Sequence, residues 1–419
     1  MTAAARTTAI NTPPRVNLAV CGVFHYRKYV GELSSRGCLV DFFYSHRLRT
    51  TARSLGIASG RAVNLWGKEY LYRGALRFGG KAGARLVGPF AHHLWDEGVA
   101  RRLRPADIFH GMLHGTLHRS FRRAREAGML TIGEPVNSHP DTLREILRHE
   151  HDVLGLPPPA DTTTVNAIVD ELPHCDRLLC GSRLIRDSYV ERGYPADRTD
   201  VIPYAVDGGS FYPLTEAERA RVDDGRFRVI CVAQIVPRKG IQYLLDAWSR
   251  LDLPRREAEL VLIGEVSREM SGVLARHAGR FTHVARVPHE RLRLEYGRAD
   301  VFVLPSVEDG FGYVTTEAMG CGLPVITTSA AGSADVVVDG VTGYVVPPRS
   351  ADALADKLST LRGDPDLRRK MADNALAASL SKITWTAYVD RLVVMYNRRI
   401  GERRSSVGTP EPMTGMAGR

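Results

Sequence analysis

The chain has 419 residues, of which 44% are hydrophobic and 25% are charged. This length allows two or three domains, and the composition is that of a globular protein. No segment approaches the ~20 consecutive apolar residues that a membrane-spanning helix needs. Residues 1–15 lack the apolar core of a signal peptide and form, we expect, a loose tail. These features predict a cytoplasmic protein.

The six cysteines show no paired spacing of the kind that holds a metal ion. Several lie in apolar, strand-like segments, so we expect buried, reduced thiols, as is usual in the cytoplasm. The cysteines are Cys21, Cys38, Cys175, Cys180, Cys231 and Cys321.

The net charge of +10 is unevenly spread. Between His46 and Phe90, nine Lys or Arg residues accompany a single acid, Glu69, and they alternate with leucines and aromatic residues. Such a surface can face anionic lipid or nucleic acid, or can simply be a solvated acceptor-side face. No nucleic-acid motif accompanies it, which leaves two interpretations of residues 46–90 open: an anionic membrane surface as partner, or a solvated face. The basic residues are Arg47, Arg49, Arg53, Arg61, Lys68, Arg73, Arg77, Lys81 and Arg85.

Apolar strand patterns alternate with helix patterns through the N-terminal half, which predicts a doubly wound α/β domain. No G-x-G-x-x-G follows the first strand, which weakens a nicotinamide-dehydrogenase interpretation. The expected strands are Val16–Cys21, Leu39–Tyr44, 107–111, Met129–Gly133 and 175–180, and the expected helices include Tyr29–Ser35, Leu117–Ala127, Leu143–Asp152, Thr162–Leu172 and Arg183–Arg192.

The C-terminal half repeats the alternation more regularly and predicts a second α/β domain. Its expected strands are Arg228–Ala233, Leu260–Gly264, Thr282–Arg286, Val301–Leu304, Val325–Thr327 and Gly343–Val346, with a helix at Ile241–Leu251 and a last helix at Trp385–Arg399.

The most informative segment follows the expected strand Val301–Leu304. A glycine turn, 309–312, leads into a short helix that carries Glu317 and ends at Gly322. A glycine loop that opens a helix binds anions through free N–H groups and the positive end of the helix dipole. Asp309 and Glu317 flank this loop, and carboxylates suit sugar hydroxyls rather than phosphate. The pairing therefore suggests a ligand with both groups, such as a nucleotide sugar.

This segment resembles the donor-site motif of family 4 retaining glycosyltransferases, which have the GT-B fold. The family pattern places Gly-Phe-Gly after the first of two glutamates separated by seven residues. Gly310, Phe311 and Gly312 match it, Glu317 is the second acid, and Asp309 replaces the first, with Glu308 beside it. The resemblance implies two Rossmann-like, doubly wound domains that face each other across a cleft.

Residues 199–207 resemble the segment that joins the two domains in this family. The family usually has glycine where this chain has Ala205, which would cost stability if the position required a positive φ. We therefore expect an acceptor-side domain at 1–205, a nucleotide-sugar domain at 206–382, a helix at 383–400 that crosses back to the first domain, and a disordered tail at 401–419.

Loop 234–240 resembles the family's basic diphosphate loop, which ends in Lys-Gly. Arg238 and Lys239 stand at a helix start, where the dipole disfavours cations unless an anion binds there. Gln234 occupies the position of the usual arginine. The loop 329–335, rich in small residues, would let backbone approach phosphate.

Three histidines lie near the carboxyl ends of N-terminal strands, where ligands bind in open parallel sheets. The family commonly places a histidine near the donor sugar on the loop that contains His139, so the resemblance assigns it a catalytic role beside Asp309 and Lys239. His110 and His114 are rivals for this role. Gly22 and His110 are expected on the acceptor-side loops.

The resemblance implies a metal-independent, retaining hexosyltransferase in glycan, polysaccharide or glycolipid biosynthesis. A UDP or GDP sugar would be its co-substrate, with no cofactor, and Arg238, Lys239 and helix N-termini would neutralise the leaving diphosphate. Two alternatives stay open: an epimerase or sugar phosphorylase of the same fold, or an inactive carbohydrate-binding homologue. The sequence identifies neither the sugar nor the acceptor.

Overall fold

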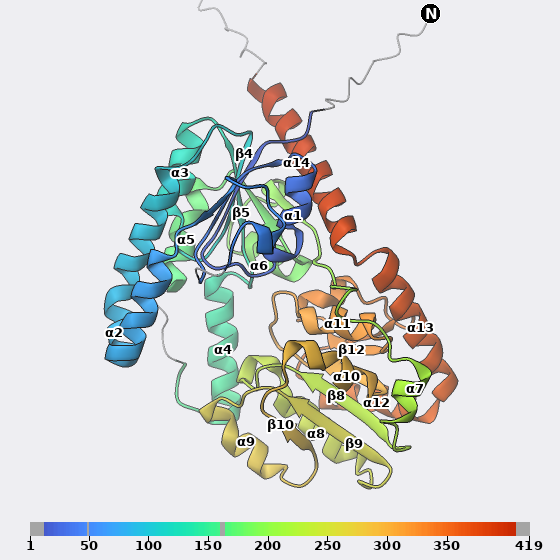
Figure 1. Cartoon of the computed structure of the whole chain (residues 1–419). Helices are drawn as coiled ribbons and strands as arrows, with labels where there is room; N and C mark the ends of the chain where they lie inside the picture. The colour runs from blue at the N-terminus through green and yellow to red at the C-terminus, as the bar shows by residue number, and fades with distance from the viewer. Residues whose placement is uncertain (1–11, 48–49, 160–163, 408–419) are drawn as a thin grey trace, which may run out of the picture.

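The computed structural model describes residues 12–47, 50–159 and 164–407. Within them the chain forms two lobes, each built around one parallel β-sheet with helices on both faces (Figure 1). The central strands of both sheets are buried apolar segments, as expected where helices cover both faces of a sheet. The predicted α/β architecture with two doubly wound domains is confirmed.

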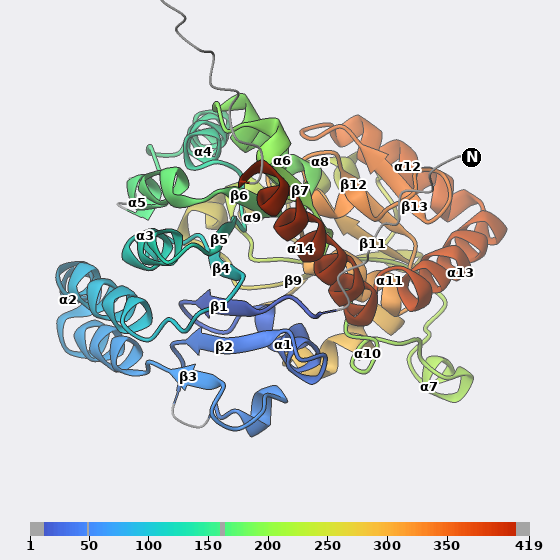
Figure 2. The ribbon, with the colours of Figure 1, turned by 90° about the horizontal axis from the view of Figure 1, so that it is seen from above.

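The N-terminal sheet has seven strands in the order β3-β2-β1-β4-β5-β6-β7 (Figure 2). All of its neighbouring strands pair in parallel. The three-residue strand β3 was not predicted, because it is too short to show a pattern within the basic segment. The strands are β1 (Val16–Val20), β2 (Leu39–Tyr44), β3 (Ala62–Asn64), β4 (Ile108–Met112), β5 (Leu130–Glu134), β6 (Arg177–Cys180) and β7 (Thr199–Val201).

The helices of this lobe are α1 (Tyr26–Ser35), α2 (Gly67–Ala100), α3 (His118–Glu126), α4 (Pro140–Leu154), α5 (Thr164–Glu171) and α6 (Arg183–Glu191). The long helix α2 is a hairpin, because Gly80 leaves the helical conformation at φ 58° and ψ −154°. Its two limbs lie side by side at the outer edge of the lobe (Figure 2). A Cβ on Gly83 would lie 2.7 Å from the carbonyl oxygen of Ala75, so the limbs pack closely near the turn.

The C-terminal sheet has six parallel strands in the order β10-β9-β8-β11-β12-β13. The strands are β8 (Phe227–Val232), β9 (Ala258–Ile263), β10 (Thr282–Val284), β11 (Val301–Leu304), β12 (Val325–Thr328) and β13 (Gly343–Val346). The helices are α7 (Glu216–Ala220), α8 (Ile241–Leu251), α9 (Ser271–Arg276), α10 (Leu292–Gly297), α11 (Tyr313–Gly320), α12 (Ala351–Gly363) and α13 (Pro365–Ser381).

The last helix, α14 (Trp385–Val407), returns to the N-terminal lobe (Figure 1). Tyr388, Leu392 and Tyr396 are buried in that lobe's core beside β1 and α1. The helix runs beyond the predicted end at residue 400, so residues 401–407 are helical rather than part of a disordered tail. The rest of the predicted tail, 408–419, lies outside the described residues, as do residues 1–11.

The structure also tests the expectations for Ala205 and for the six cysteines. Ala205 is not among the described residues with a positive φ, so alanine is not strained at the family's glycine position. All six cysteines are free, and five of them are buried. No helix in the described part of the chain is long and apolar enough to cross a membrane.

Candidate functional site

A pocket of about 410 Å³ lies between the two lobes at the carboxyl edges of their sheets. Residues from the β1–α1 loop, the segment that joins the lobes, and α11 line it, so neither lobe forms it alone. Its walls are largely aromatic and its charged side chains come from both lobes. The lining residues include Phe24, His25, Lys28, Val136, Tyr204, Asp207, His289, Asp309, Phe311, Tyr313, Glu317 and Trp385.

The glycine turn predicted as the anion site opens α11 and lies against this pocket. Gly312 is the N-cap of α11 and adopts a left-handed conformation, φ 77°. A Cβ on Gly310 would lie 2.0 Å from the carbonyl oxygen of Val136 in the N-terminal lobe. Only glycine therefore permits the turn to approach the opposite lobe this closely.

The basic residues of loop 234–240 contact two neighbouring acids, Glu308 and Asp309, at the edge of the C-terminal sheet. Lys239 forms an ion pair with Asp309, and Arg238 donates to the carbonyl oxygen and to Oε2 of Glu308 at 3.1 and 3.2 Å. Lys239 is therefore next to a pocket residue, whereas Arg238 is held against Glu308, which has no exposed surface.

Glu317 projects from α11 into the pocket. Its Oε2 accepts from the Tyr296 hydroxyl at 3.1 Å, and its Oε1 lies 3.5 Å from Nε2 of His289. The interaction with Glu317 raises the pKa of His289 above its usual value. Glu317 keeps capacity to accept further hydrogen bonds, because each carboxylate oxygen has two lone pairs.

Polar contacts from the N-terminal lobe hold the two lobes together around the glycine turn. Oε1 of Glu308 accepts from the backbone N–H and the hydroxyl of Ser138 at 3.2 and 3.1 Å. The Ser182 hydroxyl donates to the carbonyl oxygen of Gly310 at 2.7 Å. The sequence did not identify Ser138 as a site residue, since nothing local shows that it meets Glu308.

On the N-terminal side of the pocket, a buried carboxylate organises the polar side chains. Glu134, at the end of β5, is fully buried and lies against His25, Tyr26, His110 and Tyr204. Although burial acts to raise it, the contacts with His25 and His110 hold the pKa of Glu134 well below its usual value. Glu134 was not predicted as a site residue, although its position at the carboxyl end of a strand, where ligands bind in open parallel sheets, could have indicated it.

The structure does not bring His139 to the pocket. His139 is the N-cap of α4, where its Nδ1 accepts from the backbone N–H of Asp141 at 3.2 Å, and burial lowers its pKa. Its ring packs edge-on against Tyr189, beside a separate cavity. The histidine that lines the pocket is His25.

Six other predicted residues also lie outside the pocket lining: Arg238, Lys239 and Gly310, described above, and three more. His110 is fully buried, with Nδ1 2.6 Å from the Tyr396 hydroxyl, so it cannot contact an acceptor. Gln234 is exposed on its loop. Gly22 lies under the ring of Phe24, which itself lines the pocket.

His114, the other rival, stacks on Phe24 with ring centroids 5.2 Å apart, and burial lowers its pKa to about 4. In the described part of the chain, no group of three or more His, Cys, Asp or Glu side chains is arranged to hold a metal ion.

Residues 215–377 match the family model of glycosyl transferases group 1. The C-terminal lobe is a group 1 glycosyltransferase domain. The resemblance predicted from the sequence is thereby confirmed. The matched segment contains the basic loop 234–240, the glycine turn 309–312 and Glu317.

Two of the relatives that resemble this chain have names that state an activity. The chain is 29% identical over 216 residues to the alpha-D-kanosaminyltransferase of Streptomyces kanamyceticus, covering 49% of this chain and 56% of that protein. It is 27% identical over 274 residues to the GDP-mannose-dependent alpha-(1-6)-phosphatidylinositol monomannoside mannosyltransferase of Mycolicibacterium smegmatis, covering 61% and 70%. The chain therefore spans little more than half of the first relative.

Solved structures resemble nearly the whole chain. The sucrose-phosphate synthase of Thermosynechococcus elongatus superposes with a TM-score of 0.67 at 19% identity, over 93% of this chain and all of that one. Anabaena HepE in complex with UDP-glucose gives 0.64 at 18% identity, over 93% and 99%. At these identities the likeness shows the fold, which is the predicted GT-B arrangement.

Proposed function

We propose that this protein is a glycosyltransferase that moves a sugar from a nucleotide-diphosphate donor to an acceptor hydroxyl in the pocket between its lobes. The observation that carries the proposal is the placement of Asp309 and Glu317 around the glycine turn of α11, on one wall of that pocket. The named activities of the relatives, which transfer kanosamine or mannose, support the same class of reaction. A UDP-glucose complex of a protein with this fold supports a nucleotide-sugar donor.

In this proposal the diphosphate lies at the N-terminus of α11, where backbone N–H groups and the helix dipole favour an anion. Lys239 turns from Asp309 to the leaving diphosphate, whose negative charge grows as the sugar departs. Asp309 is then free to accept from hydroxyls of the transferred sugar, and Glu317 accepts from those of the ribose. Arg238 supports the loop through Glu308 rather than contacting the phosphates.

We further propose that the transfer retains the anomeric configuration and needs no metal ion. Lys239 and the α11 N-terminus supply positive charge that could otherwise come from a metal. Ser138 and Ser182 of the N-terminal lobe hydrogen-bond to Glu308 and Gly310 of the C-terminal lobe. These contacts support a reaction between closed lobes that exclude water, because water would hydrolyse the donor.

The donor can be found by measuring thermal stabilisation with a panel of UDP and GDP sugars. A donor at 100 times its Kd adds about 2.7 kcal/mol of stability. Stabilisation by at least one member is the expected result, and the same sugar should then appear on an acceptor. An epimerase would instead convert the donor without any acceptor, and an inactive binding protein would be stabilised without consuming it.

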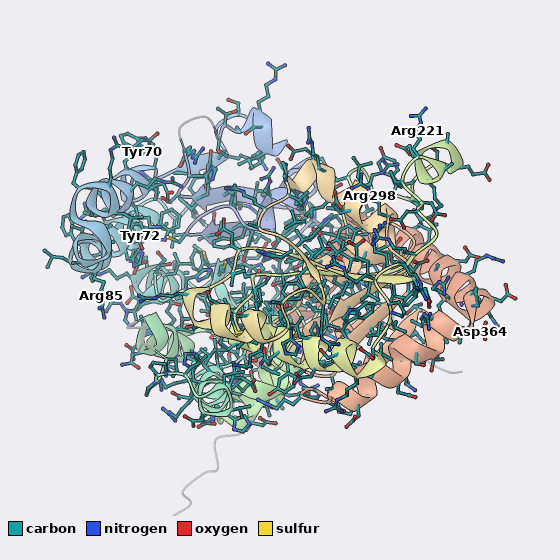
Figure 3. The ribbon with its side chains drawn as sticks, turned by 90° about the horizontal axis from the view of Figure 1, so that it is seen from below. Tyr70, Tyr72, Arg85, Arg221, Arg298 and Asp364 are labelled. Carbon is teal, nitrogen blue, oxygen red and sulfur yellow. The ribbon has the colours of Figure 1, made fainter. Side chains whose placement is uncertain are left out.

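The α2 hairpin is proposed as the surface that docks on an anionic membrane at the cytoplasmic side. Near its turn the hairpin exposes Phe78, Leu86 and Phe90, at 87%, 82% and 58% of their surfaces. Tyr70, Tyr72 and Arg85 lie on the same hairpin at the rim of the molecule (Figure 3). Exposed apolar side chains beside arginines are typical of helices that lie in a lipid interface. This docking would bring a lipid-linked acceptor to the N-terminal lobe.

A further inference from the structure

We infer that Glu150, on α4 of the N-terminal lobe, is a positioning residue for the basic loop 234–240 of the C-terminal lobe, and thereby for Lys239. The inference deepens the proposed transfer and rests on it, because Lys239 is the cation proposed to meet the leaving diphosphate. It makes the placement of that cation depend on the docking of one lobe on the other.

The second half of α4 reaches the C-terminal lobe. The helix starts at Pro140 in the N-terminal lobe and runs down to the other lobe (Figure 1). Leu154, its last residue, packs against the apolar core that contains Leu244 and Leu245 of α8. Glu150 lies in this docked half and has no exposed surface. A carboxylate buried at such a junction is costly unless hydrogen bonds satisfy it.

Three donors of the C-terminal lobe surround the Glu150 carboxylate. Its Oε1 accepts from Nε of Arg349 at 2.6 Å. Its Oε2 accepts from Nε2 of Gln242 at 2.9 Å and from the Tyr243 hydroxyl at 3.0 Å. Gln242 and Tyr243 lie in the first turn of α8, whereas Arg349 lies just before α12. One side chain of the N-terminal lobe thus ties together two separate segments of the other lobe.

Gln242 connects this carboxylate to the basic loop. Its Nε2 also donates to the carbonyl oxygen of Pro237 at 3.0 Å. Both neighbours of the amide, the Glu150 carboxylate and this carbonyl oxygen, only accept hydrogen bonds, so the NH₂ group must face them. Its two hydrogens therefore link α4 to the loop at a point two residues before Lys239.

The turn that carries Lys239 is held at both of its ends. It is a single 3-10 turn, Pro237–Lys239. At its end, a Cβ on Gly240 would lie 1.9 Å from the carbonyl oxygen of Pro305, so the chain there packs tightly against the C-terminal sheet. At its start, the hydrogen bond from Gln242 holds Pro237. This arrangement directs the Lys239 side chain toward Asp309.

The backbone of Arg349 shows that its contact with Glu150 is specific. Arg349 is one of three described non-glycine residues with a positive φ, at 64°. This left-handed conformation is costly for an L-residue and persists only where the surroundings determine it. The charge-assisted hydrogen bond from Arg349 to a fully buried carboxylate offsets that cost.

Kinetics separate the positioning role of Glu150 from a merely structural one. The probes are UDP-glucose and GDP-mannose, with water as the acceptor. Glu150→Gln keeps the shape of the side chain, but its single amide oxygen cannot accept from all three donors. It should lower the kcat of donor hydrolysis by roughly 10²-fold, as small misplacements of catalytic groups do, with little change in KM. A KM that rises as much as kcat falls would mean that Glu150 only holds the lobes together, and would overturn the inference.

A double variant tests whether the effect passes through Lys239. In the Lys239→Ala background, Glu150→Gln should cause no further loss of kcat, because the residue that it positions is already removed. Gln242→Leu, which removes the link to Pro237, should reproduce the loss seen in Glu150→Gln. Glu145→Gln, at an exposed position of the same helix, is the matched control. Losses that multiply in the double variant would overturn the inference.

Amide hydrogen exchange provides an arm that does not depend on activity. The backbone N–H of Lys239 donates to Val236 and that of Gly240 donates to Pro237, at 3.0 and 3.1 Å. Both amides should exchange about 10-fold faster in Glu150→Gln and in Gln242→Leu, and at the wild-type rate in Glu145→Gln.

Unchanged exchange in both of the first two variants would overturn the inference, whatever reaction the protein catalyses. If the wild-type protein consumes no nucleotide sugar, the proposed function fails, and the exchange rates still decide whether Glu150 orders the basic loop.

Discussion

Lys239 and Asp309 form an ion pair at the carboxyl edge of the C-terminal sheet, directly beside the glycine turn that opens α11. Both side chains are buried in the crevice, so the pair holds a cation and a carboxylate where a nucleotide sugar would place its diphosphate and its hydroxyls. In the absence of a donor, Lys239 and Asp309 neutralise each other's charge. Donor binding would exchange this pair for two sets of contacts with the ligand.

Replacement of Lys239 by alanine should lower kcat more than donor affinity. The leaving diphosphate carries more charge in the transition state than in the ground state, so Lys239 stabilises mainly the former. Loss of one such group typically costs about 10²–10³-fold in kcat. Steady-state kinetics check this, with Lys239→Arg, which keeps the positive charge, as the comparison. An increase in KM alone would mean that Lys239 merely holds the donor.

Replacement of Glu317 by alanine should abolish measurable transfer through weak donor binding. The loss of charge-assisted hydrogen bonds to ribose should cost roughly 1.5–3 kcal/mol in binding free energy. Calorimetric titration with UDP and GDP measures this, and Glu290→Ala, on an exposed neighbouring turn, is the matched control. Wild-type donor affinity in Glu317→Ala would contradict the assignment.

The same substitution should change the titration of His289. The contact with Glu317 raises the pKa of His289, so protonated His289 is favoured in the folded state. Its contribution to stability is fully present below the unfolded pKa, near 6.5, and is lost as the pH rises through the higher folded value. The pKa of His289, followed by proton NMR, should fall in Glu317→Ala; an unchanged value would show that the contact does not form in solution.

Replacement of Gly310 by alanine should separate the two lobes. The added Cβ would lie 2.0 Å from the carbonyl oxygen of Val136, which is backbone and cannot turn aside. Small-angle scattering should then show a larger radius of gyration, together with a loss of transfer. Gly208→Ala, where an added Cβ meets nothing within 4 Å, should leave both unchanged. An unaltered radius for Gly310→Ala would mean that the lobes are not held in this arrangement.

Membrane binding should depend on both the exposed apolar side chains and the arginines of the α2 hairpin. Replacing Phe78 and Leu86 with serine should remove most binding to anionic vesicles at any salt concentration. Replacing Arg77 and Arg85 with serine should weaken it mainly at low salt, since each basic residue contributes about 1 kcal/mol near an anionic leaflet. Co-sedimentation measures both effects.

Val394→Ser is the control for the apolar change, because Val394 is 68% exposed on α14, away from the hairpin. Binding that is independent of lipid charge, or that survives both sets of substitutions, would leave the hairpin as a solvated surface.

The sequence predicted the C-terminal lobe closely. Its strand Val301–Leu304 and helix Ile241–Leu251 have the predicted bounds, because short buried segments between glycines and prolines leave little choice of boundary. The α2 hairpin was not predicted, since its apolar residues are spread over exposed faces. Gly80, which turns the chain there, follows Gly79, and this Gly-Gly pair is a turn signal that the prediction did not use.

Of the predicted site residues, Asp309, Phe311, Gly312 and Glu317 line the pocket, whereas His139 and His110 do not. Asp309, Gly310 and Glu317 belong to one short segment of turn and helix, 309–317, so their spacing alone brings them together. His139 was placed on the correct loop, but the direction of its side chain depends on the cap of α4, which the pattern does not reveal. His25 lines the pocket, and its partner Glu134 is 109 positions away in the chain, so no local pattern marks the pair.

The central claim is that a nucleotide sugar bound between the lobes is transferred with retention. Time-resolved proton NMR of UDP-α-D-glucose or GDP-α-D-mannose hydrolysis, begun with the donor that stabilises the protein, tests it most directly. The account predicts that the α-anomer of the free sugar appears first and that Glu317→Ala releases none. Initial release of the β-anomer, or conversion of the donor to another nucleotide sugar without release, would contradict it.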